Sequence, residues 1–263
     1  SFPAKLLAVL VHRQQSGLPP VTVLPCELIQ DNGPALLDLL RAQADIWRLP
    51  RDLRDAVATY PVASTLVDRI VSGRPDEHPL LAQDRLLTVA EPYASWVVEQ
   101  RPGIDLFPHP AIAVTDDVAH YCLRKVRILN GAHTALVCMT RPLGIDTVAD
   151  AVAHLTVGPR LRRILFDEIL PVVEGRIVDG ESFAETTLER FANPFQRHRL
   201  ADIALPHETK VATRLLPTSH EPVAMFGEPP PLLAHLRHPS LAPLPQPHHL
   251  VLPPPPALRP PPP

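Results

Sequence analysis

The chain has 263 residues, a formal net charge of −3 and 45% hydrophobic residues. This length allows one large or two small domains. The net charge is slightly negative, whereas a nucleic-acid-binding surface is typically basic. No apolar run reaches the length of a membrane span. No signal peptide is visible either. We therefore expect neither a nucleic-acid partner nor a membrane location.

Three cysteines, Cys26, Cys122 and Cys138, are scattered along the chain without a C-x-x-C pair. An odd number of dispersed cysteines argues against a disulfide framework or a structural zinc site, and favours a reducing compartment. We expect a cytoplasmic protein. Because the sequence opens at Ser1, directly on an apolar run, it is interpreted as a piece of something longer.

Residues 1–115 mix helical and extended patterns, in the order that α/β folds use to place ligand groups at strand ends. This part is expected to be the later part of a nucleotide-binding α/β domain. The predicted elements, in chain order, are a helix after Pro3, a buried strand over 21–28, a turn at Asn32-Gly33, a helix over 34–47, an apolar segment ending at Asp68, and short strands over 86–90 and 111–115.

From residue 116 the pattern is almost wholly helical, which predicts a helical substrate domain over 116–217. Its first helix is predicted over 117–140, with an acidic start at Asp116 and Asp117. Pro171 should kink or end the third helix. The helices predicted after the first span 146–155, 158–175, 181–194 and 207–217.

Residues 218–263 are rich in proline and contain no lysine or aspartate. Each proline removes a backbone donor, so this segment is expected to be extended or disordered, with local polyproline II structure. Two interpretations stay open. The segment is either an interaction ligand or a non-native reading-frame remnant.

Lys125 lies in the middle of the apolar stripe of the helix over 117–140, roughly where a leucine belongs. A buried ammonium is costly unless it is paired, deprotonated or used. Asn130 and His133 lie on the same flank of this helix. By spacing alone, Lys125 either reaches water or an acidic neighbour, or acts as an acid/base of depressed pKa beside Asn130 and His133. Gly131 indicates that something packs closely against the helix there.

The segment KVRILNGAHT, residues 125–134, resembles the lysine–five–asparagine–three–histidine signature of the mannitol dehydrogenase family, the polyol-specific long-chain dehydrogenases. The resemblance covers roughly residues 1–217 and points toward the hexuronate branch of that family. Further stretches that carry it are LPCELIQDNG, LVDRIV, DRLLTVAEPYASWVVE, LFPHPAIAVTDDV, PLGIDTVADAVAHLTVGP and ERFANPF.

The resemblance implies an α/β fold followed by a mostly α part: a Rossmann-like nucleotide domain, then a helical substrate domain. It implies NAD as the cofactor and no metal. Lys125 would exchange the proton of the reacting oxygen. Asn130 would donate a hydrogen bond to the same oxygen, and His133 would orient the neighbouring hydroxyl.

Four further residues are implied near the ligand. Asp68 would lie near the substrate and the nicotinamide; alternatively it pairs with Arg69 or Arg85. Lys210 aligns with a substrate-binding lysine. Arg197 would hold a carboxylate, unless it is a surface arginine. Asn32 is either a substrate donor or a turn former before Gly33.

No G-x-G-x-x-G fingerprint occurs in the chain. The resemblance implies that this loop lies upstream of Ser1, so a fragment that binds NAD poorly on its own is expected. The expected function is an NAD-dependent oxidoreductase that interconverts a keto-hexuronate, tagaturonate, and its hydroxy acid, altronate. The alternatives are a mannitol- or fructuronate-type dehydrogenase, or a non-catalytic helical scaffold with a proline-rich ligand tail. The expected partner is a small sugar acid, with the oligomeric state left open.

Overall fold

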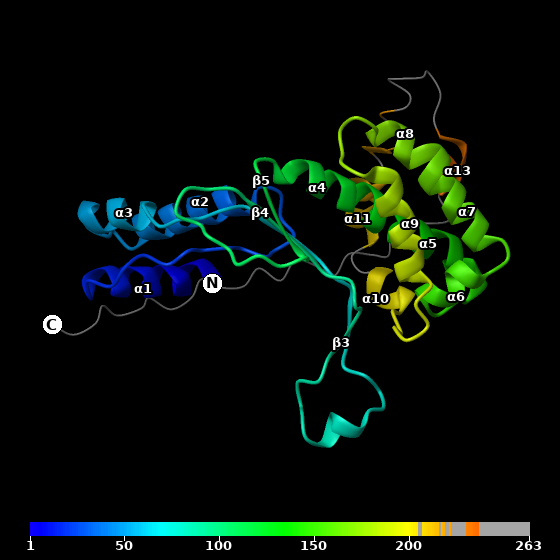
Figure 1. Cartoon of the computed structure of the whole chain (residues 1–263), viewed down its shortest axis with the longest axis horizontal. Helices are drawn as coiled ribbons and strands as arrows, with labels where there is room; N and C mark the ends of the chain where they lie inside the picture. Colours follow the sequence, from blue (N-terminus) through cyan, green and yellow to red (C-terminus); the bar gives the residue numbers. More distant parts are fainter. Residues whose placement is uncertain (205–206, 216, 219–220, 222–229, 237–263) are drawn as a thin grey trace.

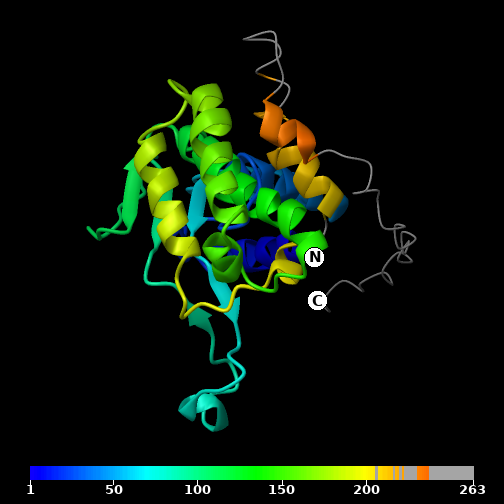
Figure 2. The ribbon, with the colours of Figure 1, turned by 90° about the vertical axis from the view of Figure 1, so that its right-hand side faces the viewer.

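The computed structural model describes residues 1–204, 207–215, 217–218, 221 and 230–236. A block of helices near the N-terminus leads through a small sheet into a helical domain (Figure 1). A thin arm projects away from this body, as the view turned by 90° also shows (Figure 2). The expected order of an α/β part followed by a mostly helical part is confirmed.

The N-terminal block consists of α1 (Phe2–Gln15), α2 (Asn32–Ile46) and α3 (Arg51–Ala58). These helices share a core that includes Leu7, Leu10, Leu36, Leu40 and Val57. The helices predicted after Pro3 and over 34–47 are therefore confirmed.

The buried strand predicted over 21–28 is wrong. Only Val23 pairs there, in an isolated parallel bridge with Val62. Pro19, Pro20 and Pro25 bracket the stretch and cannot donate to a ladder, so a β-branched run alone does not make a strand.

Strand β4 (Ser95–Glu99) is the centre of a three-stranded sheet with the order β1-β4-β5. It pairs antiparallel with β1 (Thr65–Asp68) and parallel with β5 (Ile112–Thr115). The strand predicted over 111–115 is confirmed, as is the position of Asp68 at the end of an extended segment. The central strand itself was not predicted, although its Trp-Val-Val run has high β propensity.

The arm is a two-stranded antiparallel sheet of β2 (Val71–Gly73) and β3 (Val89–Ala90). The 3₁₀ turn η1 (Pro79–Ala82) lies at its far end. Of the strand predicted over 86–90, only the last two residues pair. Its first strand, β2, begins three residues after Asp68, so the arm follows almost directly on the end of β1.

The helix predicted over 117–140 is confirmed as one continuous rod, with an irregular middle. It comprises α4 (Val118–Arg124), the π-helical turn η2 (Lys125–Asn130) and α5 (Gly131–Thr140). Asp117 caps it, because its carboxylate accepts a hydrogen bond from Ala119 N at 2.8 Å. A π turn takes more residues than an α turn, so the angular positions expected from a period of 3.6 do not hold between residues 125 and 130.

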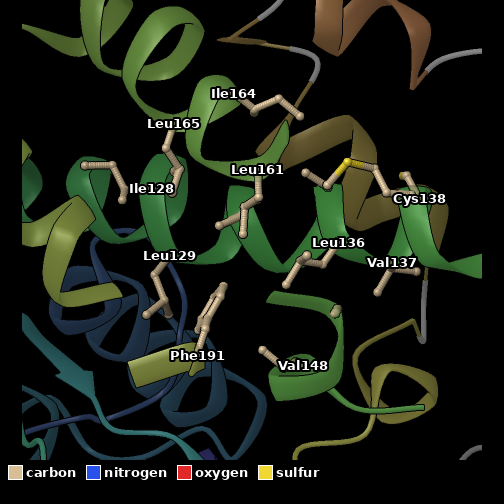
Figure 3. Close-up of a cluster of buried hydrophobic side chains, with 14 of the residues drawn as sticks. Ile128, Leu129, Leu136, Val137, Cys138, Val148, Leu161, Ile164, Leu165 and Phe191 are labelled. Atoms are coloured by element: carbon tan, nitrogen blue, oxygen red, sulfur yellow. The ribbon is translucent and has the colours of Figure 1, made fainter. Parts of the chain in front are cut away.

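The remaining helices surround this rod and bury its second half in the largest core of the described chain (Figure 3). The core includes Ile128, Leu136, Leu161, Ile164 and Leu165. These elements are η3 (Arg141–Leu143), α6 (Val148–Ala153), α7 (Val157–Arg163), the π turn η4 (Ile164–Ile169), α8 (Leu170–Val173), α9 (Gly180–Phe191), α10 (Leu200–Ala204), α11 (His207–Arg214) and α13 (Pro231–His235). Helix α8 ends two residues after Pro171, as predicted.

Helix α13 corrects the expectation of an extended segment from residue 218 onward. Leu233 and Leu236 of this region are buried in the large core. The buried carboxylate of Glu168 fixes the start of α13, because it accepts hydrogen bonds from Leu232 N at 2.6 Å and Leu233 N at 2.8 Å. The rest of the expected tail, residues 237–263, lies outside the described residues.

Two glycines differ in what their backbones require. A Cβ at Gly33 would lie 2.8 Å from Ser64 N and 2.9 Å from Ala63 C, so helix α2 meets the segment just before β1 at a distance that only glycine permits. A Cβ at Gly131 would meet Arg214 O and Ile169 Cδ1 at 3.7 Å, an ordinary contact distance. Neighbours do pack at Gly131, as expected, but they would tolerate an alanine.

We therefore predict that Gly33→Ala lowers the free energy of unfolding by about 1–3 kcal/mol, the usual cost of overpacking. Gly131→Ala should leave stability unchanged or raise it by about 0.5–1 kcal/mol, because it lowers the entropy of the unfolded chain. Urea unfolding of the two variants measures both effects. Equal losses in both would contradict the assignment of the close contact to Gly33.

Candidate active site

A cavity of about 390 Å³ lies where the end of β1 meets the π turn η2, the start of α5 and helices α10 and α11. Cavities of this size hold small molecules. It brings together the predicted site residues Asp68, Lys125, Asn130, His133 and Lys210. Residues far apart in the sequence thus share one wall.

Lys125 is half-buried at the first position of the π turn. Its Nζ donates a hydrogen bond to the carbonyl oxygen of Val67 in β1, at 2.5 Å. Within the described part of the chain, no carboxylate forms an ion pair with it. Burial lowers the pKa of Lys125; the charge of Asp68 raises that pKa again, and the charge of Arg190 lowers it. The amine is therefore easier to deprotonate than an exposed lysine.

Asn130 and His133 are buried, with 7% and 6% of their surface exposed. The Nδ2 atom of Asn130 and the Nε2 atom of His133 have no hydrogen-bond partner among the described residues. Buried polar atoms of this kind are rare, because each costs about 1–3 kcal/mol. Both residues line the cavity, so a ligand bound in it is a candidate partner for these two atoms.

The ring of His133 is fixed between two other rings. It stacks on Phe191 with the ring centroids 4.2 Å apart, and it meets His198 edge-to-face at 4.9 Å. Burial, and then the neighbouring charge of His198, lower the pKa of His133 well below its ordinary value. His133 is therefore neutral at physiological pH and has one nitrogen that donates and one that accepts.

Asp68 does not pair with Arg69 or Arg85, as one interpretation held. Its carboxylate binds the guanidinium of Arg190 in α9 through two hydrogen bonds, of 2.9 and 3.1 Å. Arg190 also binds Glu91, at 2.8 and 3.0 Å. All three side chains are buried. Burial alone would lower the pKa of Arg190, but the hydrogen bonds and charges of Asp68 and Glu91 raise it.

Two predicted site residues lie elsewhere. The amide nitrogen of Asn32 donates to the carbonyl oxygens of Pro25, Glu27 and Thr65, and its oxygen accepts from Thr65 N at 2.9 Å. Asn32 therefore ties the start of α2 to β1, and it lines a separate cavity of about 590 Å³. Because its hydrogen-bonding groups are occupied by backbone, the structure favours a structural role for Asn32 over the alternative of a substrate donor.

Arg197 is exposed and forms ion pairs with Asp76 at 2.9 Å and Asp146 at 3.6 Å. It does not line the Lys125 cavity. Its position favours the alternative interpretation, a surface arginine, over the expected contact with a substrate carboxylate.

The cavity also has wall residues that were not predicted: His198, Arg199, Asp202 and Arg214. His198 carries a further buried atom, Nδ1, without a hydrogen-bond partner. Lys210, which was predicted, donates from Nζ to the carbonyl oxygen of Ile203, and burial lowers its pKa. Helical spacing could have linked Arg214 to Lys210, because residues four apart share a helix face.

Among the described residues, no group of three or more histidine, cysteine or acidic side chains could hold a metal ion. None of their helices is long and apolar enough to cross a membrane. Because the sequence has no G-x-G-x-x-G loop, we assign none of its residues to the pyrophosphate of a dinucleotide.

Two family profiles match the chain. Residues 2–106 match the mannitol dehydrogenase Rossmann domain, and residues 117–236 match the mannitol dehydrogenase C-terminal domain. The second match includes helix α13.

Curated relatives are similar over most of the chain. An altronate oxidoreductase of Halalkalibacterium halodurans is 38% identical over 251 residues, which are 89% of this chain and 48% of that protein. One of Bacillus subtilis is 37% identical over 247 residues, which are 88% of this chain and 51% of that protein. The chain thus spans about half the length of the curated relatives it matches.

Solved structures show the same fold. Mannitol 2-dehydrogenase of Pseudomonas fluorescens, in a ternary complex with NAD and D-mannitol, superposes with a TM-score of 0.70 at 24% identity, over 88% of this chain and 48% of that one. A D-sorbitol dehydrogenase in substrate-free form gives a TM-score of 0.69 at 22% identity, over 83% of this chain and 47% of that one.

The buried cluster of Asp68, Arg190 and Glu91 generates a stability prediction. Arg190→Met should lower the free energy of unfolding by about 3–5 kcal/mol, because it leaves two buried carboxylates without their cation. The matched control is Arg162→Met, which breaks an exposed pair with Glu185 and should change stability little. Denaturant unfolding of both variants measures the two losses in free energy of unfolding. If the two variants lost the same stability, the cluster would not have the structural role assigned to it.

Proposed function

The chain belongs to the mannitol dehydrogenase family, and on this basis we propose that the whole protein is an NAD-dependent oxidoreductase for a hexuronate. The proposed reaction interconverts tagaturonate, a keto acid, and altronate, the corresponding hydroxy acid. The relatives named altronate oxidoreductase support this substrate class. The observation that carries the chemistry is one cavity lined by the half-buried Lys125 and by Asn130 and His133, each of which has a buried polar atom without a partner among the described residues.

Lys125 would move the proton. As an ammonium it donates a proton to the carbonyl oxygen during reduction, and as a neutral amine it accepts the hydroxyl proton during oxidation. The nicotinamide, when bound, supplies or accepts the hydride. The hydrogen bond from Nζ to Val67 O fixes the direction of the lysine side chain. A group with a lowered pKa is suited to both directions, because both of its protonation states are accessible.

Asn130 and His133 would position the sugar. The Nδ2 atom of Asn130 is a free donor for the oxygen that gains negative charge in the transition state. The Nε2 atom of His133 is free to bind the hydroxyl on the adjacent carbon. Because the ring of His133 is held by Phe191 and His198, it needs little reorganisation when a ligand binds.

The alternative within the family is a polyol or fructuronate dehydrogenase. Steady-state rates of the whole protein on tagaturonate, fructuronate, fructose and mannitol separate these substrates. Faster reduction of fructose than of tagaturonate would make the proposed substrate class wrong.

The acid/base role makes a direct prediction. Lys125→Ala should lower kcat for NADH-dependent reduction by at least about 10²-fold, the usual contribution of a general acid or base. The control is Lys5→Ala, which removes an exposed lysine of α1 and should leave kcat unchanged. Both are read from the loss of NADH absorbance with the whole protein. Retained turnover in Lys125→Ala would remove the assigned role.

The rates should also depend on pH in opposite directions. Oxidation of altronate needs the neutral amine, so its rate should rise as pH increases through the pKa of Lys125. Reduction of tagaturonate needs the ammonium, so its rate should fall over the same range. Because burial lowers the pKa of Lys125, this range should lie below the value of about 10.4 for an exposed lysine.

The charge of Asp68 opposes that shift, since it raises the pKa of Lys125. Asp68→Asn should therefore move both pH profiles to lower pH. Asp38→Asn, a change at an exposed carboxylate of α2, is the control and should leave them in place. A shift of the Asp68→Asn profiles to higher pH would contradict the electrostatic assignment.

A further inference from the structure

The Lys125 cavity has more positive than negative groups on its wall. Its cations are Lys125, Lys210, Arg214, Arg69 and Arg199, and its acids are Asp68 and Asp202. The carboxylate of Asp68 is already bound by Arg190 through both oxygens. A ligand that fits this wall best therefore carries a negative charge.

Most of these cations already have partners. The Nε atom of Arg69 donates to the carbonyl oxygen of Glu91 at 3.0 Å, and Arg199 lies 3.8 Å from a carboxylate oxygen of Asp76. Lys210 donates to the carbonyl oxygen of Ile203. Arg69 and Arg199 are moreover exposed or at the rim, where water satisfies them.

Arg214 is different. It is half-buried at the end of α11, and it has neither an ion pair nor a side-chain hydrogen bond among the described residues. Burial lowers the pKa of Arg214. A guanidinium taken from water without a counter-charge is costly unless a ligand supplies that charge.

The position of Arg214 places it beside the reacting groups. Its carbonyl oxygen lies 3.7 Å from the Cβ position of Gly131, which directly follows Asn130. The end of α11 is thus packed on the start of α5, and Arg214 shares the cavity wall with Lys125, Asn130 and His133. The charge of Arg214 is also felt by Lys125 and His133, whose pKa values it lowers.

We propose that Arg214 is the specificity-determining residue of this site, and that its guanidinium binds the carboxylate of the sugar acid. This inference rests on the proposed function and adds the residue that would separate sugar acids from neutral sugars. A planar guanidinium binds both oxygens of a carboxylate, which a lysine cannot do in the same geometry. Arg214 takes the role that the sequence had suggested for Arg197, which lies outside the cavity.

The test uses a matched pair of ligands, tagaturonate and tagatose, which differ in having a carboxylate or a hydroxymethyl group. The kcat/KM of the whole protein with NADH is measured on both, and their ratio is the readout. A ratio within one protein is independent of the fraction that is folded. The variants are Arg214→Gln, Arg214→Lys and, as a surface control on α7, Arg163→Gln.

Arg214→Gln should lower kcat/KM for tagaturonate by at least about 30-fold, the lower range for loss of one partner of a buried charge pair. The effect should lie mainly in KM, and kcat/KM for tagatose should fall much less, so that the ratio of the two values falls. Arg214→Lys should keep part of the preference because it keeps the charge. Arg163→Gln should keep all of it.

Two failures are distinguishable. If the wild-type protein prefers tagaturonate and Arg214→Gln keeps that preference, the assignment of Arg214 is overturned while the proposed function stands. Loss of the preference in Arg197→Gln would then locate the carboxylate site there. If the wild-type protein does not prefer tagaturonate over tagatose, the proposed substrate class and this inference are both overturned.

Discussion

The described structure depends on one buried cation. Arg190 of helix α9 is held by Asp68 from the end of β1 and by Glu91 from the base of the arm. Its guanidinium also lies over the ring of Tyr93, 4.0 Å from the centroid. Buried ion pairs add little net stability relative to apolar packing, but they accept only one geometry. This cluster therefore fixes the end of β1 against the helical domain, and the Lys125 cavity lies between these two parts.

The π turn η2 completes the site from the other side. It begins at Lys125 and ends at Asn130, so two of the proposed functional residues stand at its two ends. π turns are rare and recur at functional sites. Here the turn lies between a regular capped helix, α4, and a fully buried one, α5, which together hold it in the less favourable geometry. Packing of the large core thus stabilises the backbone that presents Lys125.

Local signals in the sequence were sufficient for many elements. Apolar periodicity and the Asp117 cap predicted the rod over 117–140, and the helices α2, α9 and α11 followed from the same kind of pattern. The π turn was not predictable, because it depends on what packs around the rod. The pairing of Asp68 with Arg190 was missed because the two residues are 122 apart in sequence. The prediction of a strand over 21–28 was wrong because a strand needs a neighbouring strand to pair with as well as residues of high β propensity.

Within the site, the residues that line the cavity were easier to predict from the sequence than their hydrogen-bond partners. Resemblance placed Lys125, Asn130 and His133 together, and the cavity contains all three. It suggested Arg197 and did not point to Arg214, because a sequence does not show whether an arginine lies at the surface or on a cavity wall. The hydrogen bonds of each polar side chain in the structure separate residues with a structural role from candidates for ligand binding. Asn32, with its amide bound to backbone, cannot contact a ligand without losing those bonds, whereas Asn130 and His133 each keep a buried polar atom without a partner among the described residues.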